Sequence, residues 1–298
     1  MAIIGAGMCG LTAADVLSRR GRCVHLFDKS RRPGGRIATR KTKFARFNHG
    51  APSIEADDPH FKKFLNDLGA IEKTGGCFVG NPFMRALFEP LMKRLDARLG
   101  VVVSHIERDP KGWLLHTENG GIFGHFDDVI VTTPAPQGAK IVNGACEFVS
   151  ERMEQVKMEP VWTGLFSFKK PIELPEAFAK STGVQRATQP SGAGDKVDDA
   201  GEAWVIHMTH DWSRDFLETD QAFLAPMLLD CLQTAYGSSL PEPAYLAAHR
   251  WRFAKAAEPF GEAFISSERR GLHAGGDWAL GQGAQEAWRS GKAIAEHI

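Results

Sequence analysis

The chain has 298 residues, and its 36 lysines and arginines balance 36 aspartates and glutamates, so the formal net charge is zero. Such a balance lacks the basic footprint that nucleic acids or acidic membranes select, and no stretch approaches the roughly 18 consecutive apolar residues of a membrane span. We therefore expect no nucleic-acid or membrane partner. The composition predicts a cytoplasmic protein of one or two domains, monomeric or homodimeric, without a leader peptide.

The first ten residues place three glycines between a short apolar strand and a helix. In this spacing the first glycine makes the turn, the second lets a pyrophosphate approach the backbone, and the third lets the helix pack on the strand. The helix, which we expect to end at Arg19-Arg20-Gly21, offers the free N–H groups of its first turn to phosphate. The loop consists of Gly5, Ala6, Gly7, Met8, Cys9 and Gly10.

A second strand, over 23–27, ends at Asp28, where an acid accepts ribose hydroxyls. Lys29 follows, and then Gly34, Gly35 and Arg36. Two adjacent glycines let the backbone lie against a pyrophosphate, and an arginine can neutralise it; an ordinary basic turn is the alternative. The segment resembles the second signature of the glutathione-reductase-type FAD fold, in its amine-oxidase-like branch. This resemblance implies FAD. Because no cysteine or histidine stands at an identifiable flavin-attachment position, we expect it to be bound without a covalent link.

The C-terminal segment resembles the closing strand and last helix of the same fold. Gly276 and Asp277 follow a short strand, and a helix is expected over 281–295. The resemblance implies that Asp277 approaches the ribityl chain and pyrophosphate. It also implies that the helix N-terminus points at the flavin ring, with contacts from Gln285, Glu286 and Ala287.

The middle of the chain alternates between the two expected domains. The pattern first predicts an amphipathic helix over 81–99, a strand over 100–106, a β-meander over 113–125 and a strand over 129–133. This order resembles the middle FAD-domain segment of the family. The resemblance implies that Val103 meets adenine and that Thr133 passes beside the cofactor. For the second domain we expect strands over 161–168, 203–208 and 247–253, a turn-rich loop over 188–195 and a helix over 220–236.

These elements, together with the resemblance to the FAD fold, imply an α/β fold of two domains. The first is a Rossmann-like FAD/NAD(P)-binding domain of the glutathione-reductase type, assembled from both chain ends. An α+β substrate domain is inserted in it. We expect the FAD-binding domain to comprise residues 1–50, 81–140 and 262–298, and the substrate domain residues 51–80 and 141–261.

Three further segments resemble renalase-like flavoproteins: the loop Phe44–Ala51, the strand His249–Ala254, and the C-terminal stretch with Trp278, Trp288 and Gly291. The resemblance implies an FAD oxidase that converts 2- or 6-dihydro isomers of NAD(P) into NAD(P)⁺ and passes the electrons to O₂ as H₂O₂. Its partners would be this small-molecule substrate, or an amine, and O₂. His49, Gly50 and Ala51 are then expected beside the cofactor.

Trp251, His249 and His49 are the candidate catalytic residues. In a strand, His249, Trp251 and Phe253 share one face while Arg250 and Arg252 take the other. We expect the aromatic face to border the flavin, with His49 at the rim; an ordinary sheet core that contains a tryptophan is the equal alternative.

Three departures from the renalase-like pattern bear on the substrate: Asn48 replaces an acid, Ser53 stands where an aromatic is usual, and Glu286 replaces a small residue. One alternative is an amine-oxidase-type enzyme, for which Lys255 is the nearest candidate lysine, although a solvated lysine is the simpler interpretation. Another is a catalytically weak FAD-binding partner protein.

No metal site or disulfide framework is expected. The five cysteines are scattered and lack a Cys-x-x-Cys pair, so they predict reduced thiols, with Cys9 as a packing residue. His207, His210 and Asp211 lie close in sequence but have no further ligand at metal-site spacing.

Overall fold

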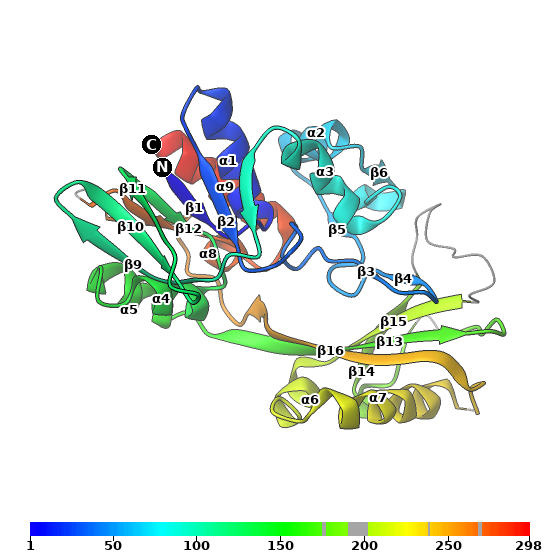
Figure 1. Cartoon of the computed structure of the whole chain (residues 1–298). Helices are drawn as coiled ribbons and strands as arrows, with labels where there is room; N and C mark the ends of the chain where they lie inside the picture. Colours follow the sequence, from blue (N-terminus) through cyan, green and yellow to red (C-terminus); the bar gives the residue numbers. More distant parts are fainter. Residues whose placement is uncertain (175–176, 190–201, 238, 268–269) are drawn as a thin grey trace.

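A computed structural model describes residues 1–174, 177–189, 202–237, 239–267 and 270–298. The chain forms two halves, one built on a six-stranded sheet and the other on a four-stranded sheet (Figure 1). Most of the loop expected over 188–195 lies outside the described residues.

The six-stranded sheet takes strands from both ends of the sequence. Its order is β17-β18-β12-β1-β2-β8, with β1 parallel to both β2 and β12. β18 is parallel to β12, and β17 is antiparallel at the edge. The strands are β1 (Ala2–Ile4), β2 (His25–Asp28), β8 (Asp96–Leu99), β12 (Val129–Val131), β17 (Ile265–Ser267) and β18 (Leu272–Ala274). This arrangement confirms the predicted Rossmann-like fold.

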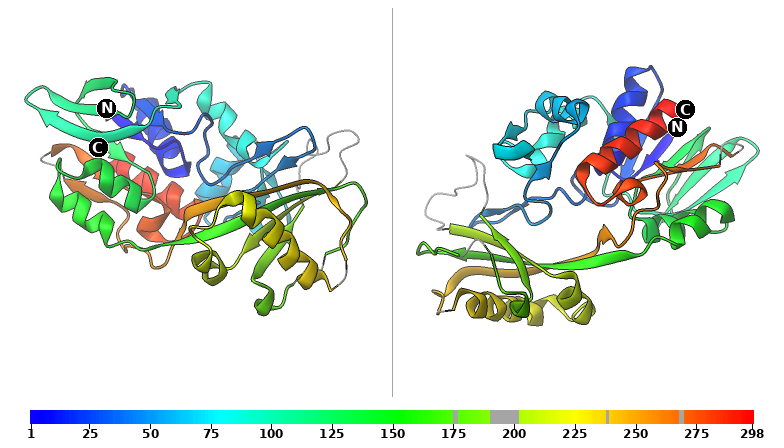
Figure 2. Two further views of the ribbon diagram at one scale, coloured as in Figure 1. Left: turned by 60° about the horizontal axis from the view of Figure 1, so that its bottom comes forward. Right: turned by 180° about the vertical axis from the view of Figure 1, so that it is seen from behind.

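Different segments cover the two faces of this sheet. One face packs against α1 (Met8–Arg19) and α9 (Ala284–His297), which lie side by side in Figure 2. The helices can approach this closely because Gly291 has no side chain. A Cβ at this position would collide with the carbonyl oxygen of Cys9. The other face packs against β9 (Val103–Asp109), β10 (Gly112–Thr117), β11 (Ile122–Phe126), α4 (Ala135–Val142), α5 (Glu147–Glu154) and α8 (Asp277–Leu280). The two termini lie near each other (Figure 1).

Residues 54–92 form a small subdomain beside α1 and α9. Phe61 and Leu65 are fully buried, and Phe61 contacts Trp288 of α9 with ring centroids 5.3 Å apart. Segment 51–80, which we assigned to the substrate domain, therefore shares its hydrophobic core with the cofactor half. Its elements are β5 (Ile54–Glu55), α2 (Pro59–Asp67), β6 (Ile71–Glu72), η1 (Thr74–Gly76), β7 (Cys77–Val79), η2 (Met84–Phe88) and α3 (Glu89–Met92).

The prediction of one helix over 81–99 was wrong. Only η2 and the single turn α3 are helical, and residues 96–99 form β8 instead. Pro90 removes a backbone donor from the segment, and pairing of β8 with the exposed edge of β2 outweighs helix propensity. The apolar positions Leu87, Leu91 and Leu95 are nevertheless buried, so the spacing indicated burial rather than one long helix.

The four-stranded sheet is antiparallel, in the order β14-β15-β13-β16. Its strands are β13 (Met158–Phe168), β14 (Val184–Thr188), β15 (Glu202–Met208) and β16 (Pro243–Ala256). One face carries η3 (Lys180–Thr182), α6 (His210–Asp215) and α7 (Gln221–Tyr236), whereas the other faces β3 (Arg40–Lys41) and β4 (Arg46–Phe47) (Figure 1).

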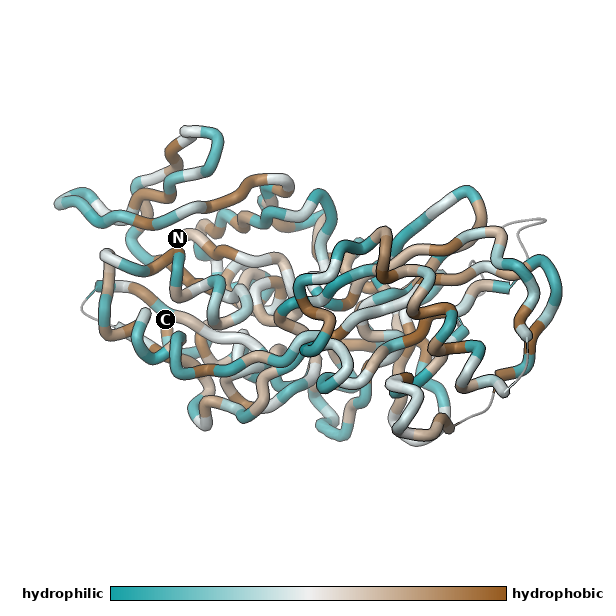
Figure 3. The backbone as a smooth tube through the Cα atoms, turned by 90° about the horizontal axis from the view of Figure 1, so that it is seen from below, coloured by the Kyte–Doolittle hydropathy of each residue, from teal (hydrophilic) through white to brown (hydrophobic). Residues whose placement is uncertain are grey.

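Hydropathy along the chain alternates over short stretches in both halves, as the tube in Figure 3 shows. None of the described helices is long and apolar enough to cross a membrane.

Candidate functional site

The loop between β1 and α1 has the geometry that its glycines predicted. Gly5 has φ +114°, a conformation that favours glycine, and a Cβ on Gly10 would collide with the carbonyl oxygen of Gly5. A Cβ on Gly7, in contrast, would meet no described atom within 4 Å. Close packing thus requires glycine at two positions, whereas the third leaves free space against the backbone, which fits a phosphate group.

Asp28 closes this loop from the end of β2. Its carboxylate accepts hydrogen bonds from the backbone N–H of Ala6 and of Ser30, each at 2.6 Å. Its carbonyl accepts from Val101 at 2.9 Å, which brings the residues before Val103 beside the loop. Lys29 is exposed. In the structure the acid therefore braces the glycine loop from the end of β2.

The second glycine pair lies directly against the first loop. Gly34 donates its N–H to the carbonyl of Ala6 at 2.8 Å, and a Cβ on Gly35 would lie 3.3 Å from the Cα of Gly7. Gly35 has φ +54°. Two segments without side chains thus meet at one point, as a dinucleotide pyrophosphate requires.

Arg36 and Asp277, expected as separate cofactor contacts, pair with each other. Their two hydrogen bonds measure 2.8 and 2.6 Å in the bidentate arrangement, and Arg36 also donates to the carbonyl of Ala254 at 2.8 Å. The Asp277 side chain is only 5% exposed, and that of Arg36 is 30% exposed. The pair joins the N-terminal loop to the C-terminal segment.

A threonine pair completes the loop from β12. Thr132, which sequence reasoning missed, donates its hydroxyl toward the carbonyls of Ile4 and Gly5 at 3.1 and 2.9 Å. The predicted Thr133 accepts at its carbonyl from the indole of Trp278, at 3.1 Å, while its hydroxyl is buried without a described partner. In the sequence, only the Thr-Thr-Pro turn after β12 indicated that this segment lies near the glycine loop.

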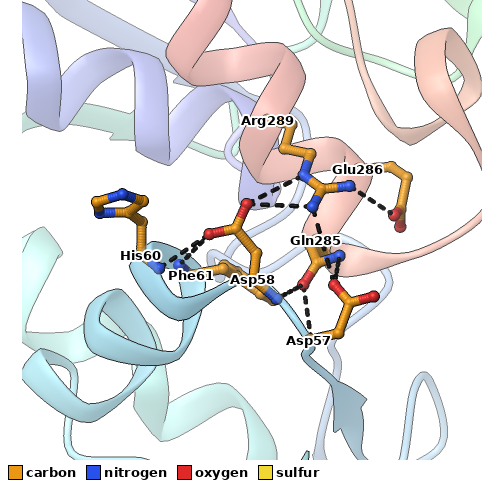
Figure 4. A network of polar contacts seen from close by, with 7 residues as sticks. All are labelled: Asp57, Asp58, His60, Phe61, Gln285, Glu286 and Arg289. Atoms are coloured by element: carbon orange, nitrogen blue, oxygen red, sulfur yellow. Dashed lines mark hydrogen bonds and ion pairs between the residues drawn. The ribbon is translucent and has the colours of Figure 1, made fainter.

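Side chains at the N-terminus of α9 form hydrogen bonds and ion pairs with the residues that precede α2. Gln285 accepts backbone N–H groups of Asp57 and Asp58 at 3.0 Å each and donates to the Asp57 carboxylate (Figure 4). Arg289 binds Asp58 at 3.1 Å and lies 3.9 Å from Glu286.

At the first turn of α9, the Glu286 side chain folds back over Gly281 and Gly283. Ala287 is buried.

Residues 49–51 are held between the glycine loop and the four-stranded sheet. The N–H of Ala51 donates to the carbonyl of Arg36 at 2.8 Å. On the opposite side, Trp251 donates its indole N–H to the carbonyl of His49 at 2.9 Å, and Nε2 of His207 lies 3.0 Å from the carbonyl of Gly50. His207, which the sequence suggested only as a metal ligand, therefore links the four-stranded sheet to the loop at Gly50. Only the register of β15 against β13 places its side chain at this loop.

His49, His249 and Trp251, which we call the ring cluster, contact one another. The rings of His49 and Trp251 stack with centroids 5.4 Å apart, and His249 meets both edge-on at 4.7 and 4.4 Å. Burial lowers the pKa of His49 to about 3, helped by His249 and Arg40, and that of His249 to about 4, helped by Arg40. The cluster is therefore neutral.

The other face of β16 follows the predicted alternation. Arg250 and Arg252 both pair with Glu218, away from the ring cluster. Lys255 is exposed at the strand end, which gives an amine-oxidase lysine no support.

Asn48 and Cys9 have structural roles. Asn48 is buried and accepts at its side-chain oxygen from the Thr39 hydroxyl at 2.8 Å and from the Met84 N–H at 3.3 Å. Ser53 lies half-buried before β5. Burial raises the pKa of Cys9 to about 12, so its thiol is not a nucleophile.

The described residues contain no group of three or more metal-ligating side chains. His210 contacts the carbonyl of Pro160 at 3.0 Å, apart from the link that His207 makes. All five cysteines are free thiols in the structure.

Comparison with known proteins agrees with this geometry. Residues 3–68 match the family of NAD(P)-binding Rossmann-like domains, and residues 72–298 match the family described as flavin containing amine oxidoreductase. Renalase from Mus musculus is 24% identical, and the match covers 85% of this chain and 84% of the relative.

Two solved structures share the fold. A variant of putrescine oxidase with redesigned cofactor binding has a TM-score of 0.70 at 13% identity, covering 100% of this chain and 98% of the other. A CLA-producing fatty acid isomerase from P. acnes has a TM-score of 0.70 at 14% identity, with the same coverage. At these identities the likeness concerns the fold alone.

Proposed function

Because the chain belongs to the flavin-containing amine oxidoreductases, and is thus a flavin-dependent oxidoreductase, we propose that it binds FAD without a covalent link and oxidises 2- or 6-dihydro isomers of NAD(P). The products are NAD(P)⁺ and H₂O₂, with O₂ and one proton consumed. Similarity to renalase over 85% of the chain supports this assignment, as does the resemblance of the loop over 44–51 and of the His249–Ala254 strand to renalase-like flavoproteins.

The residues that hold the cofactor follow from the two glycine loops. Gly7 and Gly35 would accept its pyrophosphate against bare backbone, and Asp28 would exchange its bonds to backbone N–H groups for ribose hydroxyls. Bound FAD supplies a two-electron acceptor that takes a hydride from the substrate and returns the electrons to O₂. The purified protein should be yellow, and acid precipitation should release all of the colour. A protein that cannot be reconstituted with FAD would contradict the assignment.

The observation that carries the substrate proposal is the neutral ring cluster beside Gly50. A dihydropyridine already holds a transferable hydride, so its oxidation requires orientation rather than a general base. His49, His249 and Trp251 offer aromatic surface and hydrogen-bonding nitrogens without a charged base, since burial keeps the pKa of both histidines low. One face of Trp251 is taken by His49, so a substrate ring would use the remaining surface.

Anaerobic mixing tests the substrate. The holoenzyme is mixed with 2-, 4- and 6-dihydro-NAD(P) and with simple amines while bleaching of the visible flavin band is followed. We expect fast bleaching with the 2- or 6-dihydro isomers alone, and slower bleaching in Trp251→Ala. Lys255→Met, which changes an exposed side chain, is the matched control. Bleaching by amines only, or by no compound, would refute the proposal.

A further inference from the structure

Each imidazole of the ring cluster has one nitrogen whose hydrogen bond fixes its tautomer. Nδ1 of His249 lies 3.1 Å from a guanidinium nitrogen of Arg40. Because a guanidinium can only donate, this Nδ1 must accept. Nδ1 of His49 lies 3.4 Å from the carbonyl oxygen of Phe47, which can only accept, so this Nδ1 must donate.

The opposite nitrogens of the two rings then differ in kind. A neutral imidazole carries a single N–H, and both rings are neutral because burial lowers their pKa values to about 3 and about 4. Nε2 of His249 is therefore a donor, and Nε2 of His49 is an acceptor. The two rings lie at 88° to each other with centroids 4.7 Å apart, so a donor and an acceptor belong to neighbouring rings.

Both Nε2 atoms keep some exposed area and have no described protein partner. Neither Nε2 has a hydrogen-bond partner among the described residues. Neither is among the fully buried polar atoms that lack a partner, so each keeps a small exposed area. Arg40 also lines a surface cavity of about 340 Å³ between β16 and α7, together with Pro226 and Ala247, which shows that its side chain reaches the molecular surface.

We propose that the Nε2 pair of His249 and His49 recognises a primary carboxamide attached to a planar ring. A carboxamide presents a carbonyl oxygen, which accepts from His249, and an NH₂ group, which donates to His49. A carboxylate presents only acceptors and would face the lone pair of His49, whereas a ketone lacks the donor. The assignment of this carboxamide to a dihydronicotinamide rests on the proposed function.

Arg40 acts in this arrangement as a positioning residue. By donating to Nδ1 it keeps the proton of His249 on Nε2, where the substrate carbonyl needs it. Methionine at position 40 would release His249 to carry its proton on either nitrogen. Lysine, which also only donates, would preserve the tautomer.

Equilibrium binding to the oxidised holoenzyme tests the recognition. The probes are nicotinamide, 3-acetylpyridine, pyridine and nicotinic acid, and the readout is perturbation of the flavin absorption band. Because each lost hydrogen bond is worth about 0.5–1.5 kcal/mol, we expect nicotinamide to bind about 2- to 12-fold more tightly than 3-acetylpyridine, with nicotinic acid weakest. Nicotinic acid binding as tightly as nicotinamide, or no perturbation by any probe, would overturn the proposal.

Substitution of Arg40 adds a readout that a merely structural role would not change. Arg40→Met should reduce the preference for nicotinamide over pyridine, and Arg40→Lys should restore it. Lys41→Met is the matched control, since it removes a neighbouring cation whose side chain is exposed. An unchanged preference in Arg40→Met would contradict the role of Arg40.

The two proposals fail separately. An enzyme that oxidises the dihydro isomers but binds nicotinamide no better than pyridine keeps its function and lacks this recognition. An enzyme that shows the expected order of probes but is not reduced by dihydronicotinamides keeps the recognition and lacks the function.

Discussion

Replacing Arg36 by methionine leaves the Asp277 carboxylate without its partner, where only 5% of that side chain meets solvent. Breaking a buried ion pair in this way costs about 3–5 kcal/mol, and the 30% exposure of Arg36 favours the lower end. An unfolding entropy of about 2.1 cal/mol/K per residue gives about 0.6 kcal/mol/K for 298 residues. A loss of about 3 kcal/mol should therefore lower the Tm by about 5 °C.

A double-mutant cycle, measured by urea unfolding of apoprotein and holoprotein, separates the pair from its surroundings. Asp277→Asn keeps the shape and removes the charge, so the double variant should lose less stability than the sum of the single variants, by about 2 kcal/mol. Additive losses within about 0.5 kcal/mol would refute the pair as a stabilising unit. A loss confined to the holoprotein would mean that Arg36 acts through the cofactor, as the sequence motif alone suggested.

Three further perturbations test the loops and the buried imidazoles. Gly10→Ala should lower stability by about 1–3 kcal/mol in thermal unfolding, because its Cβ meets the backbone, whereas Gly7→Ala should leave the apoprotein unchanged and weaken FAD binding in a fluorescence titration. Asp28→Ala should weaken FAD by about 1–3 kcal/mol in the same titration, and unchanged affinity would argue against a ribose contact. His49 and His207 both have a pKa lowered from 6.5 to about 3 by burial. Their stabilisation is complete above pH 6.5 and is lost as the pH falls toward 3, by about 2 kcal/mol per imidazole at pH 5. Urea midpoints that stay constant from pH 7 to pH 4.5 would contradict this.

Local motifs predicted the cofactor half well because their physics is local. The spacing of Gly5, Gly7 and Gly10 and the place of Asp28 follow from a strand, a turn and a helix in succession, and the structure shows each in its expected place. The helix expected over 81–99 failed because a neighbouring strand, far away in sequence, recruits residues 96–99.

Contacts between distant segments were beyond sequence reasoning. Nothing in the Gly-Gly-Arg motif indicates that Arg36 pairs with a carboxylate 241 residues later. His207 looked like part of a metal motif, and only the register of β15 against β13 turns it toward Gly50. The ring cluster was predictable in part, because strand alternation places His249 and Trp251 on one face, but the contact of Arg40 with His249 was not.

The interlocking of α1 with α9 has a consequence for synthesis on the ribosome. The thiol of Cys9 lies 3.8 Å from the hydroxyl of Ser290, although 281 residues separate them. Strand β1 and helix α1 are synthesised long before β18 and α9, which complete their sheet and cover their surface. The nascent cofactor half therefore exposes apolar surface during most of its translation, a state in which chains aggregate readily. Folding of this half should be completed late and be slow because its decisive contacts close a very long loop.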